Sequence, residues 1–153
     1  MSRVSLPAAW VATVLSICLN ASAHEDEQIP QGAPDRLGEV SFPISCSAPA
    51  QREFDRAMAM LHSFFYPEAG RTFGRVAAID PSCAMGHWGV AMSWWYPLWY
   101  PPTRESFTQG KSAIERAAAV GGKTERESAY IAALTAFYGD FDGLDHKSRA
   151  LAY

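Results

Sequence analysis

The feature that most constrains the fold of this chain is an internal repeat with a period of 34 residues. Apolar positions keep their size class between the first two copies, in which Phe54, Ala57, Met58, Leu61 and Phe65 correspond to Trp88, Ala91, Met92, Trp95 and Trp99. The same spacing recurs at Tyr130, Ala133, Leu134, Phe137 and Phe141. Because a period in the thirties is typical of stacked helix pairs, we predict an all-α chain of antiparallel helix pairs.

Capping residues and helix breakers place the first two pairs. The first pair spans residues 47–81, with Ser47 as a good N-cap. Pro67 cannot continue its first helix but fits the start of its second. The second pair spans residues 82–122 and carries an insertion, YPLWYPP, between its two helices. Because this insertion is rich in proline, it cannot be helical throughout.

A third repeat spans residues 123–153 and has a clear helix start. Thr124 and Glu127 have the spacing of a capping box, and the helix that they begin is expected to reach about Tyr138. A further helix begins at Asp145 and runs to the last residue of the sequence. A stack that ends in mid-helix leaves an apolar face uncovered. We therefore expect an array truncated after about two and a half repeats, which either continues in a longer protein or self-associates through its open C-terminal end.

Residues 1–23 have the features of a secretory signal peptide. Arg3 supplies a short basic region, Leu6 to Leu19 is mostly apolar, and Ala21-Ser22-Ala23 is a small-residue cleavage signature. The apolar run is short for a membrane span. A retained membrane anchor and a lipoprotein signal ending at Cys18 are the alternatives. We predict an exported protein, periplasmic or secreted, with no stable membrane span after cleavage.

Residues 24–46 are predicted to be an extended lead-in to the helices. Their first part is polar and acidic, whereas Leu37 to Ile44 is more apolar. Pro43 favours an extended backbone before it. We expect this apolar part to lie across the first helix as a cap, with a short edge strand as the alternative.

Composition narrows the classes of function. A chain with 48% hydrophobic and 19% charged residues is expected to fold. Its net charge of -3 and the absence of a basic run give no support to a nucleic-acid partner. The sequence has no Gly-x-Ser-x-Gly elbow and no cluster of acids that suggests a raised pKa. We therefore predict a non-enzymatic protein without a cofactor.

The first pair resembles a known repeat family. The run Phe54-x2-Ala57-Met58-x2-Leu61, followed by Ala69-x3-Phe73 and by Pro81, has the spacing of the tetratricopeptide repeat (TPR). Met58 replaces the usual small Gly, and the turn is one residue short. The segments LGEVSFPISCSAPAQREFDRAMAMLHSFFYPEA and CAMGHWGVAMS are similar to exported bacterial TPR proteins of unassigned activity. The resemblance implies a TPR-like superhelix that binds a protein or peptide segment along its first helices.

The register of this family assigns residues to the binding groove. Small or polar side chains stand at these positions, as suits a surface that holds an extended chain: Arg52, Asp55, Ala59 and His62 in the first helix, and Gly86, Gly89, Ser93 and Tyr96 in the third. The identity of the partner does not follow from the sequence.

Export leaves two cysteines, Cys46 and Cys83, in an oxidising compartment. Each stands just before or at the start of the first helix of a repeat, and equivalent helix ends lie side by side in a stack of this kind. We predict a disulfide between them, with two buried free thiols as the alternative.

Two short motifs are typical of other chemistry. Cys83 and His87 have the i, i+4 spacing of two metal ligands on one helix, and His62 could join them in a rival periplasmic metal- or cofactor-dependent helical enzyme. Because the disulfide would consume Cys83, we predict no metal site. The run from Ala117 to Thr124 resembles a phosphate-binding loop, but a helix stands where that chemistry needs a strand.

Aromatic residues gather at the insertion. Trp94, Trp99 and Tyr100 need not belong to the core, whereas Trp95 lies on the apolar stripe. Amphipathic aromatic side chains are frequent at binding interfaces, so we expect some of these three to contact a partner. Packing of the inserted loop over the helices is the alternative.

Overall fold

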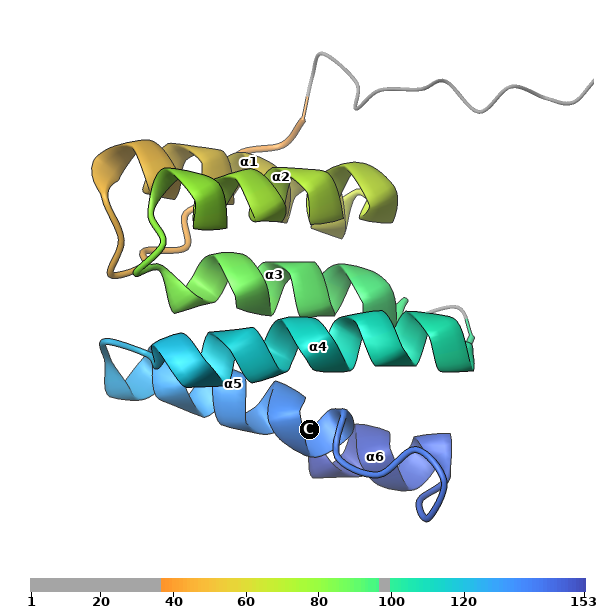
Figure 1. Ribbon diagram of the computed structural model, residues 1–153. Helices are drawn as coiled ribbons and strands as arrows, with labels where there is room; N and C mark the ends of the chain where they lie inside the picture. The colour runs from red at the N-terminus through yellow and green to blue at the C-terminus, as the bar shows by residue number, and fades with distance from the viewer. Residues whose placement is uncertain (1–36, 97–99) are drawn as a thin grey trace, which may run out of the picture.

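A computed structural model describes residues 37–96 and 100–153, and this part of the chain is all-helical, without strands. Its six helices are α1 (Ala48–His62), α2 (Tyr66–Ile79), α3 (Ala84–Trp95), α4 (Arg104–Val120), α5 (Glu125–Phe137) and α6 (His146–Ala152). Figure 1 shows α1 and α2 as one antiparallel pair, with α3 and α4 stacked on it and α5 and α6 beyond. Within the described ranges, no helix has the length and apolar character needed to cross a membrane.

Capping residues mark the ends of the later helices. Thr103 accepts a hydrogen bond from the main-chain N–H of Ser106 at the start of α4, and Asp145 accepts one from Ser148 at the start of α6. Gly121 ends α4 with a φ of 82°, which glycine adopts without steric cost. Local capping interactions therefore define the ends of these helices. The predicted signal peptide, residues 24–36 of the lead-in and Trp99 lie outside the described residues.

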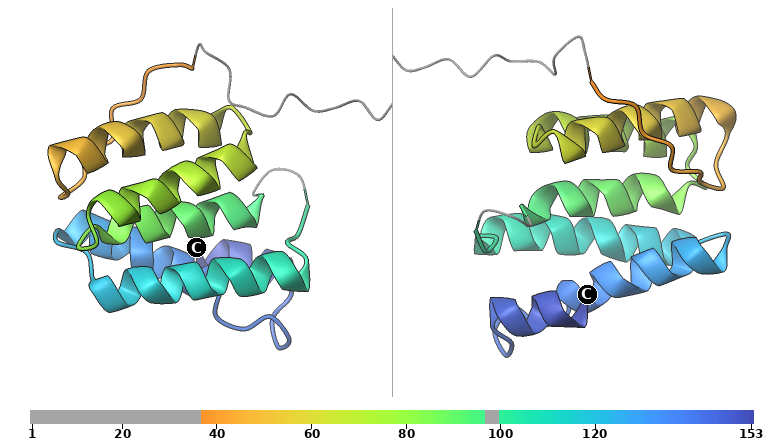
Figure 2. Two further views of the ribbon diagram at one scale, coloured as in Figure 1. Left: turned by 45° about the horizontal axis from the view of Figure 1, so that its top comes forward. Right: turned by 180° about the vertical axis from the view of Figure 1, so that it is seen from behind.

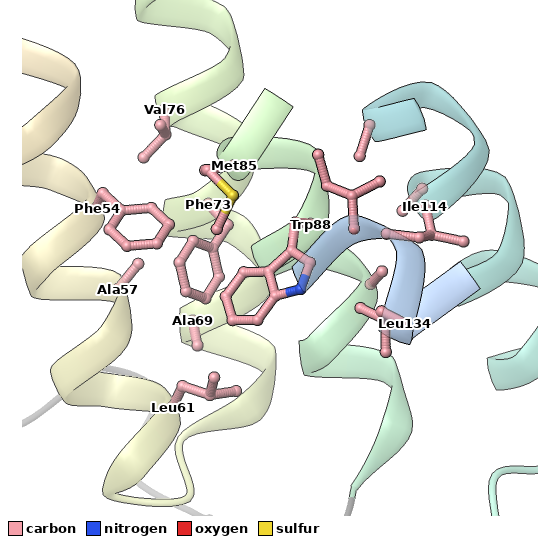
Figure 3. Close-up of a cluster of buried hydrophobic side chains, with 14 of the residues drawn as sticks. Phe54, Ala57, Leu61, Ala69, Phe73, Val76, Met85, Trp88, Ile114 and Leu134 are labelled. Carbon is pink, nitrogen blue, oxygen red and sulfur yellow. The ribbon is translucent and has the colours of Figure 1, made fainter. Parts of the chain in front are cut away.

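Repeat-equivalent aromatic side chains lie next to one another in the core. Phe54 of α1 and Trp88 of α3 are 0% and 3% exposed, and their ring centroids are 6.5 Å apart. Tyr130 of α5 continues the row, 5.6 Å from Trp88 in an edge-to-face contact. Figure 3 shows Trp88 close to Phe73, with Ile114 and Leu134 on its other side. The first helices α1, α3 and α5 are thus held side by side by the repeated positions.

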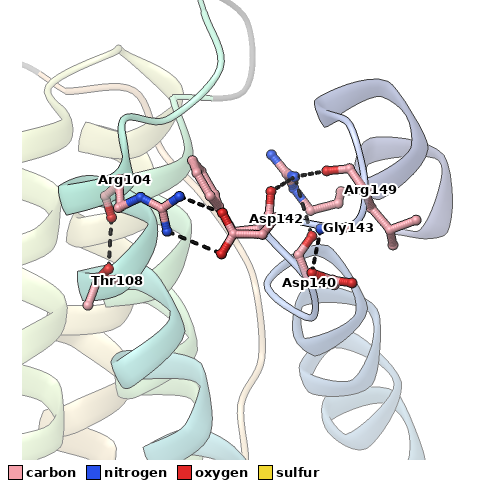
Figure 4. Close-up of polar contacts among 8 residues, drawn as sticks. Arg104, Thr108, Asp140, Asp142, Gly143 and Arg149 are labelled. Carbon is pink, nitrogen blue, oxygen red and sulfur yellow. Dashed lines mark hydrogen bonds and ion pairs between the residues drawn. The ribbon is translucent and has the colours of Figure 1, made fainter.

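A buried arginine attaches α6 to the rest of the fold. Arg149 is 3% exposed and lies over the rings of Phe107 and Phe141, at 5.2 and 5.1 Å from their centroids. Its guanidinium also donates to main-chain carbonyls of the loop between α5 and α6, including that of Leu144. Figure 4 shows this loop bound to α4 as well, through two hydrogen bonds from Arg104 to Asp142. Cation–π and charge-assisted contacts therefore add to apolar burial at this end, where Phe107 is 4% exposed.

Candidate functional site

The candidate site is the face on which residues 37–45, here called the strap, cross the first helices. The strap has neither helical nor strand structure. Figure 2 shows it running over α1 toward the start of α3. The prediction that Leu37 to Ile44 caps the first helix is confirmed. The strap also reaches α3 and α5, which the sequence did not predict.

One side chain of the strap contacts all three first helices. The ring centroid of Phe42 lies 5.5 Å from that of Phe54 in α1, 6.2 Å from that of Trp88 in α3 and 5.4 Å from that of Tyr130 in α5. The guanidinium of Arg126 lies 4.7 Å from the same ring. Phe42 is therefore an aromatic anchor at the point where the three helices meet.

The main chain of the strap is bound by two side chains of α1. The N–H of Phe42 donates to Asp55 Oδ1 at 3.4 Å, and its carbonyl accepts from Gln51 Nε2 at 2.9 Å. The N–H of Ile44 donates to Gln51 Oε1 at 2.7 Å. Gln51 Nε2 also donates to Asp55 Oδ1 at 2.9 Å, and this bond fixes the orientation of the two side chains relative to the strap. Because these bonds are made to main-chain groups, an extended segment of a different sequence could form them too.

Glu127 binds the strap from α5. Glu127 is 3% exposed, and its carboxylate accepts from the N–H of Ser45 at 2.6 Å and from the main-chain N–H of Lys123 at 2.9 Å. Thr124 caps α5 as predicted, by accepting from the N–H of Glu127 at 3.2 Å. The other half of the predicted capping box differs, since the carboxylate reaches Lys123 and the strap. Arg126 adds a hydrogen bond to the carbonyl of Pro43.

A disulfide holds the end of the strap. Cys46 and Cys83 lie at disulfide distance, with an S–S separation of 2.04 Å and a Cα–Cα distance of 5.3 Å, as the sequence predicted. Beside them, Asp80 accepts from the N–H of Ser47 at 2.8 Å. Hydrogen bonds from Ser82 and Ser47 hold the pKa of Asp80 below its usual value. The start of α1 is therefore linked covalently to the start of α3 and by a hydrogen bond to the end of α2.

The structure divides the predicted groove residues into two groups. In α1, Arg52 and His62 are exposed, whereas Asp55 and Ala59 line a cavity of about 590 Å³ together with the strap. Of the predicted groove residues of α1, Asp55 is the one that binds the strap by a hydrogen bond, which it accepts from the N–H of Phe42.

In α3 the predicted groove positions do not lie on that face. A Cβ atom at Gly89 would come within 2.1 Å of the Phe73 ring, and one at Gly86 within 2.8 Å of the main-chain nitrogen of Ala77. Both glycines are therefore packed against α2. Ser93 is buried and Tyr96 packs edge-on against Tyr66 of α2 at 5.0 Å. These four positions of α3 therefore face the preceding helix, α2, and do not lie on the strap face with Asp55.

The rival metal-binding set is not brought together. Cys83 is joined to Cys46, which lies just before α1. His62 is the last residue of the same 15-residue helix, about 22 Å along its axis from that end. No group of three His, Cys, Asp or Glu in the described ranges is placed to hold a metal ion. The phosphate-loop resemblance falls at the end of α4, where Gly121 follows a helix and not a strand.

His87 predicts a pH dependence of stability. It is half-buried, and burial lowers the pKa of its imidazole below 6.5, with the nearby positive charge of Arg116 as a further cause. Since the unfolded chain then binds the proton more readily, this contribution to stability is present above pH 6.5 and is lost as pH falls through the folded pKa. We expect the free energy of unfolding, measured in urea, to fall less between pH 7.5 and 5.5 in His87→Asn than in the wild type. An equal fall in the free energy of unfolding in both proteins would show that His87 is not the source of the pH dependence.

The aromatic residues around the insertion have different environments. Trp95 is buried in the core, with its ring centroid 4.1 Å from that of Phe137. Trp94 is half-buried, and Tyr100 is 62% exposed and stacks on Tyr96 at 5.9 Å. Trp94 and Tyr100 therefore remain available at the surface near the end of α3.

The fold and the strap face together describe an all-helical protein that holds a non-helical segment across three neighbouring helices. Comparison with models of protein families, with curated proteins and with solved structures found no match to this chain. The geometry of the strap face is therefore the basis on which a function can be assigned.

Proposed function

We propose that the protein is a non-enzymatic scaffold of the TPR type that binds an extended protein or peptide segment on the face formed by α1, α3 and α5. The observation that carries this proposal is the strap itself. The face already holds a stretch of polypeptide by hydrogen bonds to its main chain and by one aromatic anchor, Phe42. A partner segment would use the same contacts after displacing the strap.

The strap also indicates the chemistry of the partner. Aromatic anchors in desolvated pockets supply much of the affinity of an interface, whereas main-chain bonds give sequence-independent affinity. Phe42 is followed by Pro43, whose fixed φ limits the conformations of the unbound segment. We infer that the partner presents an aromatic residue in an extended segment, with a neighbouring residue that stiffens the backbone.

Repeated packing supports the TPR-like arrangement. Tyr96 and Tyr138 directly follow α3 and α5, at the ends of successive first helices, and both pack against the preceding second helix. Tyr96 contacts Tyr66 of α2, and a Cβ atom at Gly110 of α4 would come within 2.1 Å of the Tyr138 hydroxyl. Two repeat-equivalent tyrosines thus have the same packing role in the second and third helix pairs. A disulfide is typical of exported proteins, which agrees with the proposed periplasmic or secreted location.

Binding of a strap peptide in trans tests the proposal. The probe is a fluorescent peptide with the sequence of residues 37–45, added to the full-length Phe42→Ala protein. Because the variant retains its binding face but has lost the anchor of its own strap, we expect it to bind the peptide at least about tenfold more tightly than the wild type does, a difference of about 1.4 kcal/mol. Fluorescence anisotropy measures both affinities.

Two controls accompany this measurement. The same peptide with alanine at the position of Phe42 should bind neither protein. Leu151→Ala, which removes a side chain that is 78% exposed on α6, should behave as the wild type. A Phe42→Ala protein that keeps its helical circular dichroism yet does not bind the peptide would overturn the proposal.

A further inference from the structure

A second concave site lies between α2 and α3 and shares no lining residue with the strap contacts. It is a cavity of about 380 Å³, and three aromatic residues, Tyr66, Trp94 and Tyr96, form much of its lining. Pockets for small molecules begin at about 300 Å³ and are lined mainly by apolar and aromatic side chains. The size and lining of the cavity therefore suit a ring-sized ligand.

The floor of this cavity is kept open by a missing side chain. A Cβ atom at Gly70 would lie 3.3 Å from the Cβ of Ser93, so any larger residue there would occupy the space. The hydroxyl of Ser93 donates to the carbonyl of Gly89 at 3.0 Å. Its oxygen lone pairs can still accept a hydrogen bond from a ligand.

The wall at Tyr96 is held in a costly conformation. Tyr96 has a φ of 53°, in the left-handed region that residues with a side chain rarely adopt. Its ring packs edge-on against Tyr66 on one side and stacks with Tyr100 at 5.9 Å on the other. Backbone strain of this kind persists where the surroundings fix it, and it clusters at ligand-binding positions.

Charge narrows the class of ligand. Among the described residues that line the cavity, Arg71 is the only charged one, and no carboxylate lines it. The guanidinium pairs with Glu68 Oε1 at 2.8 Å through one of its nitrogens and is well exposed. Because a guanidinium has five N–H donors, it can bind an anion as well. A cationic ligand would find no counter-ion in the lining.

We infer that this cavity binds an aromatic ring that carries a carboxylate, with the ring among Tyr66, Trp94 and Tyr96 and the carboxylate at Arg71. Such a group can come from a free aromatic acid or from the C-terminal aromatic residue of a peptide. The ring and the charge are common to both sources. The test therefore uses one probe of each kind.

The probes are indole-3-propionate and the peptide Gly-Gly-Trp, each titrated into the full-length protein and followed by NMR shifts of the Gly70 and Ser93 amides. We expect saturable binding of at least one acid, and weaker binding, by about tenfold or more, of the same compound with its carboxylate converted to an amide. The acid that binds more tightly identifies the source. Failure of both acids to give saturable shifts would overturn the inference.

A matched pair of glycine variants distinguishes binding in the cavity from binding elsewhere on the surface. Gly70→Leu places a side chain into the floor and should abolish binding of the acid. Gly74→Leu makes the same change one turn further along α2, where a Cβ atom meets nothing within 4 Å, and should leave binding unchanged. Arg71→Gln should weaken binding of the acid but not of the amide. Equal affinity of the acid for both leucine variants would contradict the assignment of the site.

Discussion

Replacement of Phe73 by alanine is expected to lower the free energy of unfolding by about 3–5 kcal/mol, the usual cost of deleting a buried phenylalanine side chain. Phe73 is 0% exposed and packs edge-on against Phe54 with a centroid separation of 5.3 Å. Figure 3 shows it between α1 and α3. Its loss would remove the central contact between the first helix pair and the second. Urea unfolding followed by circular dichroism measures the change.

A neighbouring residue provides the control for this variant. Ile79 lies on the same helix but is 47% exposed. Ile79→Ala should therefore cost clearly less than Phe73→Ala, because much of its side chain is already in water. If the two substitutions had equal effects, the core between α1, α2 and α3 would not be organised around Phe73 as described.

Removal of the disulfide is expected to have the next largest effect. The two cysteines are 37 positions apart in the sequence, and cross-linking a loop of this length stabilises the folded state by about 3–4 kcal/mol in the chain-entropy model. The double variant with Cys46→Ala and Cys83→Ala should lose a comparable amount of stability. Unfolding in urea without a reducing agent measures this loss.

The wild-type protein in dithiothreitol serves as an independent control for the double variant. Its stability should fall to a similar level, because reduction opens the same loop without changing the sequence. If the free energy of unfolding fell by less than about 1 kcal/mol in both the double variant and the reduced wild type, the disulfide would not stabilise the fold by constraining the unfolded chain.

Local sequence signals predicted the helices and the disulfide because the chemistry involved is short-range. Thr103 and Asp145 cap α4 and α6 through hydrogen bonds to residues three positions later, and Gly121 ends α4 with its own backbone conformation. The two cysteines stand at equivalent helix starts. Each of these features is visible in a window of a few residues or in the period of the repeat.

The strap could be predicted only in part, because its partners are distant in the sequence. The apolar character of Leu37 to Ile44 indicated a segment that covers a helix. Nothing local to Phe42 indicates that its ring meets Tyr130, or that Glu127 accepts a hydrogen bond from Ser45 across 82 positions. The capping-box spacing identifies Glu127 as a helix-capping residue, whereas its hydrogen bond to the strap depends on how the third repeat stacks.

The predicted groove positions of α3 lie away from the strap for a physical reason. Gly86, Gly89 and Ser93 are small, and small residues permit either ligand access or close approach of a neighbouring helix. In α3 they permit the approach of α2. The equivalent positions of α1 have no preceding helix in the described ranges, so Arg52 and His62 are exposed. Residue size alone does not distinguish these two environments.

The helices α1, α3 and α5 form one continuous face that holds the strap. The most direct test is a set of nuclear Overhauser effects from the ring protons of Phe42 in the full-length protein, measured at neutral pH without reductant. We expect cross-peaks from this single ring to the rings of Phe54, Trp88 and Tyr130. Cross-peaks to α1 alone, or to none of the three, would contradict the account.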